Sequence, residues 1–158
     1  QQQRAGDEDR AGDEEAAEQF YHEASVLIAN SEFRPKLFFP MKASNIITAY
    51  RLNYQDDALE AAGLLFEKYK ESEQRIVDIN RADALCPIGE AYAYMKQEDS
   101  AEQVYLYALD QAVINPNSRP RLEDLNLIVI SLIEYDVSLT PGLHEKIDGL
   151  VSSLGSPW

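Results

Sequence analysis

The sequence has few of the features on which several classes of protein depend. Its 158 residues include one cysteine, Cys86, so an internal disulfide framework is excluded. No apolar run reaches the about 18 residues that a membrane-spanning helix requires, and the longest, residues 127–133, still contains Ser131. No P-loop, GxSxG or GxGxxG pattern occurs. These absences leave enzymatic activity without support, so we expect neither catalytic residues nor a cofactor.

Basic residues are also scarce. Fourteen lysines and arginines stand against 28 aspartates and glutamates, which gives a net charge of −14. A surface this acidic repels phosphate backbones and anionic lipids. We therefore expect protein partners, with no nucleic acid binding and no membrane insertion. The hydrophobic fraction of 45% is ordinary for a globular protein, and the length is sufficient for one domain with its own core.

The start of the chain, 1–18, differs in composition from the rest. RAGDED at residues 4–9 is nearly repeated as RAGDEE at residues 10–15, and no large apolar residue occurs in this stretch. Such a segment buries too little surface to offset the entropy lost on ordering. We predict a flexible acidic tail at residues 1–18 and a single helical-repeat domain at residues 19–158.

Beyond this tail, apolar residues recur at helical spacing, and no stretch alternates with period two for long enough to form a strand. Capping signals mark several helix boundaries. Thr140 precedes Pro141, which is typical of a helix start, and Ser100 with Gln103 fits a capping box. The sequence therefore predicts an all-α fold of about seven helices.

One stretch, Ala82–Asn115, has the spacing of a 34-residue helix–turn–helix unit. Bulky and small residues fall at positions 4, 7, 8, 11, 20, 24 and 27 of this unit: Leu85, Ile88, Gly89, Tyr92, Ala101, Tyr105 and Ala108. The pattern resembles a tetratricopeptide repeat. Gly89 and Ala101 would let two antiparallel helices approach closely, while Tyr92 and Tyr105 fill the space around them. Pro87 lies within the first helix, which we expect to be short or kinked.

The unit does not recur one repeat length away on either side, because Gln55 upstream and Glu123 downstream fall where glycine is required. Looser helix pairs with a longer period occur at 36–53 with 56–71 and at 119–135 with 141–154. The resemblance implies about three antiparallel helix pairs in a right-handed superhelix, an α-solenoid. An unrelated antiparallel helical bundle stays open as the alternative.

In tetratricopeptide arrays, five positions of the first helix line a concave groove that binds the partner. The resemblance places these positions at Asp83, Cys86, Glu90, Ala93 and Tyr94. None of them is the Lys or Asn with which one subclass of the family clamps a carboxylate. A mildly acidic groove with an aromatic residue suits a basic or apolar segment. The implied function is a non-catalytic scaffold or adaptor for protein–protein interaction.

Candidate metal ligands are few. A calcium-loop pattern over residues 7–18 fails at Ala11, where an oxygen ligand is required, and no helix is expected before it. The two histidines, His22 and His144, are far apart in the sequence, so we expect no metal site. Cys86 has no histidine near it in the sequence, and a thiol nucleophile is therefore not indicated.

A second resemblance is to the small all-helical accessory subunit of mitochondrial cytochrome c oxidase. That family also has an acidic N-terminus and a leucine-rich helix that leads into a Tyr-Asp turn, as at residues 132–137 here, but Pro141 comes later than its pattern requires. The resemblance implies an alternative function, a structural accessory subunit of a large complex such as a respiratory one. The run Leu37–Phe39 would then belong to an exposed apolar patch that contacts neighbouring subunits.

The compartment is open between two alternatives. The chain starts at Gln1 rather than at Met. Either a targeting segment has been removed, which would place the protein in an organelle or the periplasm, or the chain is a shortened cytoplasmic protein. In both cases we expect a soluble protein.

Overall fold

The computed structural model describes the backbone of residues 2–155 and the side chains of residues 12–155. Within this range the chain forms α-helices, two single-turn 3-10 helices and no strand, which confirms the predicted all-α class. The α-helices are α1 (Gln2–Asn30), α2 (Pro35–Arg51), α3 (Gln55–Ser72), α4 (Arg81–Tyr94), α5 (Glu98–Val113), α6 (Ser118–Glu134) and α7 (Pro141–Ser153). The 3-10 helices, Glu73–Arg75 and Asp78–Asn80, connect α3 to α4.

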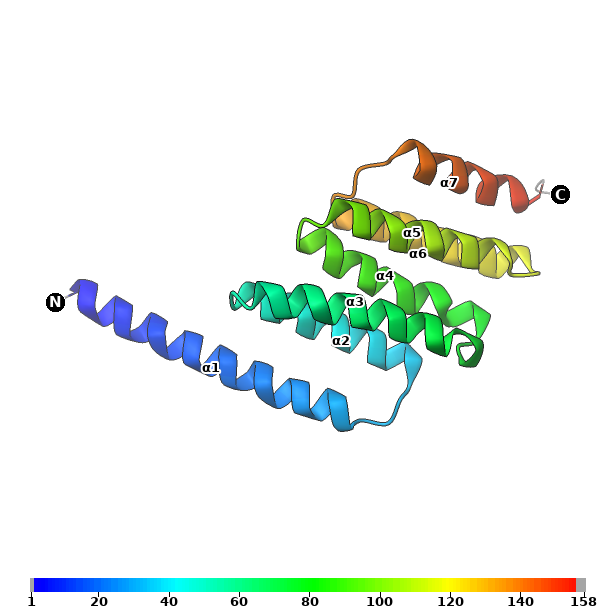
Figure 1. Cartoon of the computed structure of the whole chain (residues 1–158). Helices are drawn as coiled ribbons and strands as arrows, with labels where there is room; N and C mark the ends of the chain where they lie inside the picture. The colour runs from blue at the N-terminus through cyan, green and yellow to red at the C-terminus, as the bar shows by residue number, and fades with distance from the viewer. Residues whose placement is uncertain (1, 156–158) are drawn as a thin grey trace.

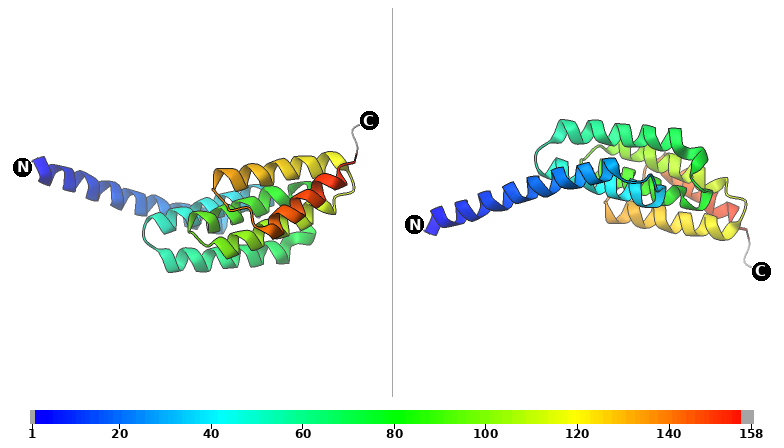
Figure 2. Two further views of the ribbon diagram at one scale, coloured as in Figure 1. Left: turned by 90° about the horizontal axis from the view of Figure 1, so that it is seen from above. Right: turned by 90° about the horizontal axis from the view of Figure 1, so that it is seen from below.

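The helices form three consecutive pairs, α2 with α3, α4 with α5 and α6 with α7, preceded by α1 (Figure 1). The first helices of the pairs pack against one another, α2 on α4 and α4 on α6. The second helices cover this layer from one side (Figure 2). The pairs coincide with those expected from the sequence, whereas a right-handed superhelical path stays a prediction.

The first helix of each pair ends in the same backbone turn. The residues after the helix ends, Asn53, Lys96 and Asp136, have left-handed φ values of 66°, 60° and 52°. The amide of the next residue then donates a hydrogen bond of 2.9–3.0 Å to the carbonyl oxygen five residues earlier. This is the Schellman arrangement. The three turns lie at the same end of the molecule (Figure 1), and the interval between them is longer than a tetratricopeptide unit.

The pair α4–α5 shows the close packing predicted from its small residues. Ala101 is buried, and Gly89 faces the ring of Tyr105 so closely that no side chain would fit between them. Pro87 lies inside α4, which has 14 residues and continues on both sides of the proline. The 17-residue α2 likewise contains Pro40, so the length of α4 does not test the expected effect of Pro87. The close approach of two helices at a glycine, expected from the sequence, is therefore present in this pair.

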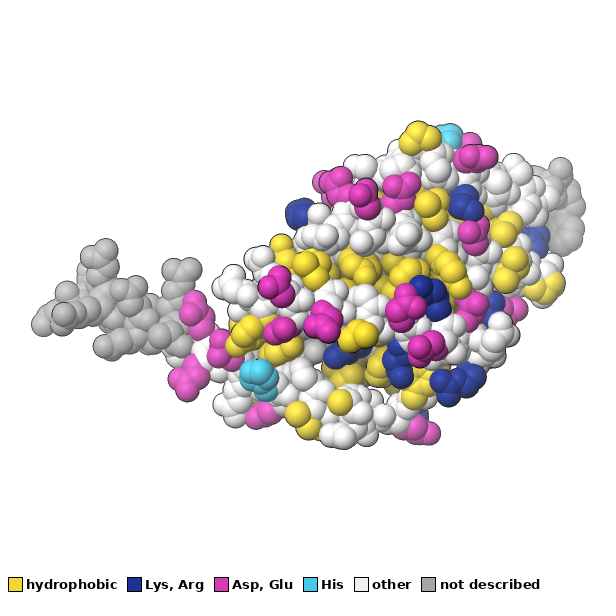
Figure 3. Space-filling view, in the orientation of Figure 1, with side chains coloured by type: hydrophobic (Ala, Val, Ile, Leu, Met, Phe, Trp, Pro, Cys, Tyr) yellow, Lys and Arg dark blue, Asp and Glu magenta, His cyan; other side chains and the backbone are white. Residues whose placement is uncertain are grey.

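Aromatic side chains fill the space between α3 and α5. Figure 3 shows a band of apolar side chains between these helices, with acidic side chains on both sides. Phe66 of α3 and Tyr107 of α5 meet there edge to face, with ring centroids 5.7 Å apart. The Tyr107 hydroxyl also donates a hydrogen bond of 2.7 Å to Glu73. The band links the two pairs across their second helices.

One of the predicted caps is present and another is not. Thr140 caps α7, because its side chain accepts a hydrogen bond of 3.2 Å from the amide of Leu143. The capping box at Ser100 was wrong: α5 already begins at Glu98, and no side chain caps it. The preceding Schellman turn determines this earlier start.

The segment predicted as a flexible tail is helical in the structure. α1 runs back to Gln2, and its first half extends past the other helices (Figure 2). Alanine and glutamate, which are frequent there, favour helix even without packing. The residues of the calcium-loop pattern lie in this helix, and the side chains of Asp7 and Asp9 are outside the described ones. The mobility of the segment stays a prediction.

The apolar run Leu37–Phe39 does not form an exposed patch. Phe39 is fully buried and packs edge to face on Tyr69 at 5.7 Å, and Phe38 is half-buried, so only Leu37 is exposed. The run opens α2, where successive residues point about 100° apart around the helix axis. In the part of the chain that the structure describes, no helix has the length and apolarity to cross a membrane.

Candidate protein-binding groove

Three of the five predicted groove residues face α6. Cys86 is buried, with a relative exposure of 2%, and Asp83 is half-buried. Glu90 accepts a hydrogen bond of 2.6 Å from Ser131 of α6. These side chains are covered by the third helix pair, so Cys86 in particular is closed to a partner.

The contact of Glu90 belongs to a buried polar network. Ser131 also lies 2.7 Å from the hydroxyl of Tyr105. Since the single Ser131 proton is donated to Glu90, the Tyr105 hydroxyl donates to Ser131. Burial raises the pKa of the Glu90 carboxyl, while the bond from Ser131 works against that shift. The network thus connects α4, α5 and α6 through one residue of each helix.

The other two predicted residues, Ala93 and Tyr94, line an open groove. It runs across the last turns of α2, α4 and α6, the first helices of the three pairs. We call it the tyrosine groove; its lining residues are Ile47, Tyr50, Ala93, Tyr94, Lys96, Glu134, Tyr135 and Asp136. The rings of Tyr50 and Tyr94 meet edge to face, with centroids 6.2 Å apart. Tyr94 is 38% exposed, so its ring is available to a ligand.

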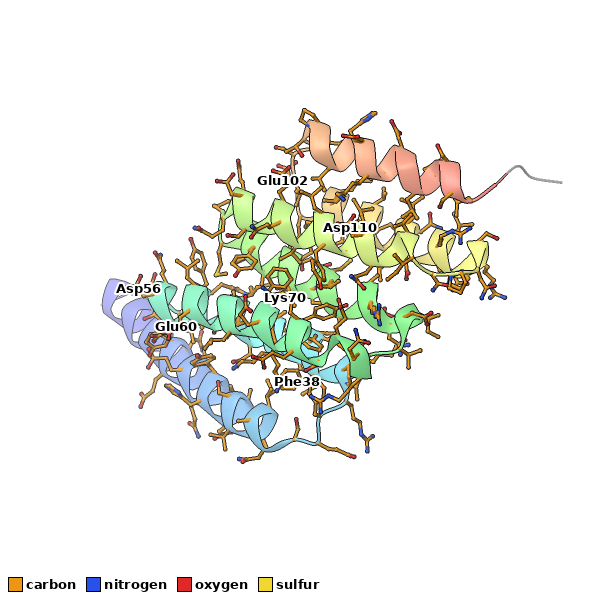
Figure 4. All side chains as sticks on the ribbon, turned by 45° about the vertical axis from the view of Figure 1, so that its right-hand side comes forward. Phe38, Asp56, Glu60, Lys70, Glu102 and Asp110 are labelled. Carbon is orange, nitrogen blue, oxygen red and sulfur yellow. The ribbon has the colours of Figure 1, made fainter. Side chains whose placement is uncertain are left out.

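The tyrosine groove continues into a second hollow between the α4–α5 turn and the α6–α7 loop. The two share Ala93, Lys96, Tyr135 and Asp136. The second hollow adds three carboxylates, at Glu98, Asp99 and Glu102. Glu102 points from α5 toward the start of α7 (Figure 4), where it accepts a hydrogen bond of 2.5 Å from Thr140.

The lining is therefore acidic and aromatic. Together the two hollows present five carboxylates, those of Glu98, Asp99, Glu102, Glu134 and Asp136, and a single cationic side chain, Lys96. Tyrosine rings offer broad apolar contact at small entropic cost because they have few rotatable bonds. Such a surface favours a segment that is cationic and carries an apolar anchor.

The most perturbed carboxyl of the described residues lies away from this groove, toward the starts of α4 and α6. Asp124 of α6 is 6% exposed. Burial, together with the negative charges of Asp83, Asp78 and Glu123, raises its pKa to about 7. Burial likewise raises the pKa of the neighbouring Cys86 thiol, which keeps it protonated and unreactive at neutral pH.

No metal-binding group of three or more His, Cys, Asp and Glu side chains occurs among the described residues. His144 pairs with Asp148 one turn later, over 3.1 Å, a contact that its spacing in the sequence could have indicated. His22 packs against the rings of Tyr21 and Tyr54. Neither histidine has an arrangement that suggests catalysis.

Tyr50 and Tyr135 are the groove residues that the sequence reasoning missed. Each lies further from Tyr94 along the chain than one tetratricopeptide unit, so a template shifted by one such unit does not reach them. The interval between the three left-handed turns is longer, yet applied to Tyr94 it reaches the neighbouring residues Arg51 and Glu134 rather than the tyrosines. Comparison with protein-family models, curated proteins and solved structures found no match to this chain.

Proposed function

We propose that the chain is a non-catalytic protein–protein interaction scaffold of tetratricopeptide-like type. Its tyrosine groove would hold an extended, basic segment of a partner with at least one large apolar side chain. The observation that carries the proposal is the convergence of Tyr50, Tyr94 and Tyr135 from three successive helix pairs. Stacked helix pairs that present side chains to one extended surface are the usual basis of binding by helical-repeat proteins.

The charge of the groove supports the chemistry of the segment. Five carboxylates against Lys96 would attract lysine and arginine side chains and repel an acidic tail. The apolar anchor would lie against Tyr94 and Tyr50, whose rings meet edge to face and of which Tyr94 is 38% exposed. The carboxylates at the rim of the groove would mainly determine the rate of association. The tyrosines would contribute most of the binding free energy.

Selection of peptides from an unbiased displayed library, with the full chain as target, tests this function. We expect enriched peptides that combine lysine or arginine with an aliphatic or aromatic residue. Their binding should fall about tenfold or more in Tyr94→Ala, since buried tyrosines are frequent hot spots. Leu64→Ala is the matched control, because Leu64 is an exposed apolar residue, on α3, outside both hollows. Enrichment of acidic peptides, or equal binding by both variants, would refute the proposal.

The alternative, an accessory subunit of a large complex, rested on a resemblance and on Leu37–Phe39 as an exposed patch. Phe39 is in the core and Phe38 packs against Phe33 at 5.2 Å, so this run offers the alternative no support. We therefore propose the scaffold alone.

A further inference from the structure

Helix α1 is held by one neighbour only. Among the described helices it packs substantially against α2 alone, whereas the helices of the three pairs each contact at least two others. The side of α1 next to its contact with α2 is open. Phe20 and Leu27, both 70% exposed, lie on it. Two large apolar side chains at this exposure require an explanation, because together they offer an extended apolar surface.

The open side of α1 has the spacing of a coiled-coil seam. Ala17, Phe20, Ala24 and Leu27 are separated by three, four and three residues, the a and d positions of a heptad. We call these four residues the α1 seam. Ala17, Phe20 and Ala24 also line an open apolar groove together with Pro40 and Met41 of α2. A helix of similar chemistry could lie along this groove.

We propose that the occupant is a second copy of this chain, which packs its own α1 antiparallel against the α1 seam. In an antiparallel pair, an a position faces a d position of the other helix. Phe20 of one copy then faces Ala24 of the second, and Leu27 faces Ala17. Each large side chain meets a small one at all four levels. In a parallel pair, Phe20 would face Phe20 and Ala24 would face Ala24. The two large side chains would then crowd each other, and the two small ones would leave a void.

The charges of α1 favour the same direction. Three acidic residues of its described part, Asp13, Glu14 and Glu15, precede the seam, while Glu18 and Glu23 lie alongside it. Basic residues follow the helix at the α1–α2 turn, where Arg34 and Lys36 are exposed. Glu32 of the same turn pairs with Arg34 over 2.8 Å, so among the described side chains Lys36 carries the unpaired charge of the turn itself. Lys68 and Arg75 lie over the ring of Phe33 beside the same turn, at 4.9 and 5.5 Å from its centroid.

An antiparallel pair places the acidic half of each α1 near the basic turn of the other copy. With Phe20 opposite Ala24, Asp13 lies opposite Ser31 of the second copy, at the end of α1 where the turn that carries Arg34 and Lys36 begins. A parallel pair would set the acidic halves side by side, at a cost that the net charge of −14 would increase. Size and charge thus select one orientation.

Sedimentation velocity and light scattering on the full chain test the association. We expect twice the 17.8 kDa of one chain at micromolar concentration. Phe20→Glu and Leu27→Glu should each give a monomer with unchanged helix content. Val26→Glu is the matched control: Val26 is 60% exposed on the same helix but lies about 100° around it from Leu27, so this variant should stay dimeric.

Orientation is tested with a spin label at Gly12→Cys, where an added Cβ meets nothing within 4 Å, while Cys86 is buried and stays unlabelled. In the antiparallel pair, position 12 of one copy lies level with position 32 of the other. At a rise of 1.5 Å per residue, the two labelled positions are then about 30 Å apart along the helix axis. Parallel pairing predicts about 10 Å. A chain that stays monomeric at millimolar concentration, a dimer indifferent to Phe20→Glu, or the short distance would each overturn the proposal.

Discussion

A Cβ atom on Gly89 of α4 would lie 2.7 Å from Cε2 and 2.8 Å from Cζ of Tyr105 on α5. The ring cannot retreat easily. Tyr105 is fully buried, and its hydroxyl is held by Ser131 of α6. The glycine is therefore required by the approach of two helices, and the position of the ring links three helices to one another.

Replacing Gly89 with alanine should destabilise the fold. The Cβ must displace the ring or separate α4 from α5, and overpacking of this kind costs about 1–3 kcal/mol. Gly149→Ala is the matched control. Gly149 lies inside α7 with nothing within 4 Å of its added Cβ, so this change should stabilise by about 0.5–1 kcal/mol. Urea unfolding of both variants measures the difference, and a stabilised Gly89→Ala would contradict the packing described.

The Tyr105–Ser131–Glu90 network should respond unequally to loss of its members. Tyr105→Phe removes one terminal donor, which costs about 1 kcal/mol. Ser131→Ala strips a donor from Glu90 and an acceptor from the buried Tyr105 hydroxyl, so it should cost about 1–3 kcal/mol. Ser152→Ala, whose hydroxyl bonds only to its own helix, is the control and should be near neutral. Equal losses in the first two variants would show that Ser131 is not the centre of the network.

Asp124 should make stability fall as the pH rises toward neutrality. Its folded-state pKa of about 7 lies above the usual 3.8, so between these values the folded chain keeps a proton that the unfolded chain has lost. Stability from this group is complete below about pH 4 and is lost as the pH rises to about 7, by at most about 1.4 kcal/mol per unit. Asp124→Asn should flatten this slope in unfolding experiments at pH 5, 6 and 7.5. Glu60→Gln, at an exposed carboxyl of α3, should leave the slope intact, and an unchanged slope in Asp124→Asn would contradict the assignment.

The two capping positions predicted from the sequence should differ in their sensitivity. Thr140→Ala removes both the bond from the Leu143 amide and the bond to Glu102, and should cost about 1–2 kcal/mol. Ser100→Ala should cost well under half of that, because Ser100 sits inside the first turn of α5 without a capping bond. Thermal unfolding of the two variants checks this order, and a reversed order would restore the capping box that the structure lacks.

The helices could be located from the sequence because each buries one apolar stripe, and stripes at helical spacing are visible in one dimension. The fit of Gly89 to Tyr105 was accessible for the same reason, since both lie within one contiguous pair. The helical structure of the acidic start of α1 was not predicted from the sequence. The segment has few apolar residues, so it shows no apolar stripe, and the preference of alanine and glutamate for helix was not taken into account.

Only some residues of the tyrosine groove could be predicted from the sequence. Ala93 and Tyr94 line this open groove, while Cys86 and Glu90 face α6. That the groove binds a partner stays a prediction. Which side of α4 stays open depends on how the third pair packs, and that packing is not encoded within the window itself. Tyr50 and Tyr135 were missed because the turns at Asn53, Lys96 and Asp136 recur at longer intervals than the template, and none of these residues is the glycine that is usual in such a turn. Each tyrosine also lies at a different distance from its turn.

The central claim, that the tyrosine groove binds a basic segment with an apolar anchor, is tested most directly by chemical-shift mapping. The ¹⁵N-labelled full chain is titrated with a peptide of that composition selected on it. We predict that the largest chemical-shift changes on peptide addition cluster at the groove residues Ile47, Tyr50, Ala93, Tyr94 and Tyr135. In Tyr94→Ala these changes should vanish. Shifts confined to the outer surface of α3, α5 and α7, or none at millimolar peptide, would contradict it.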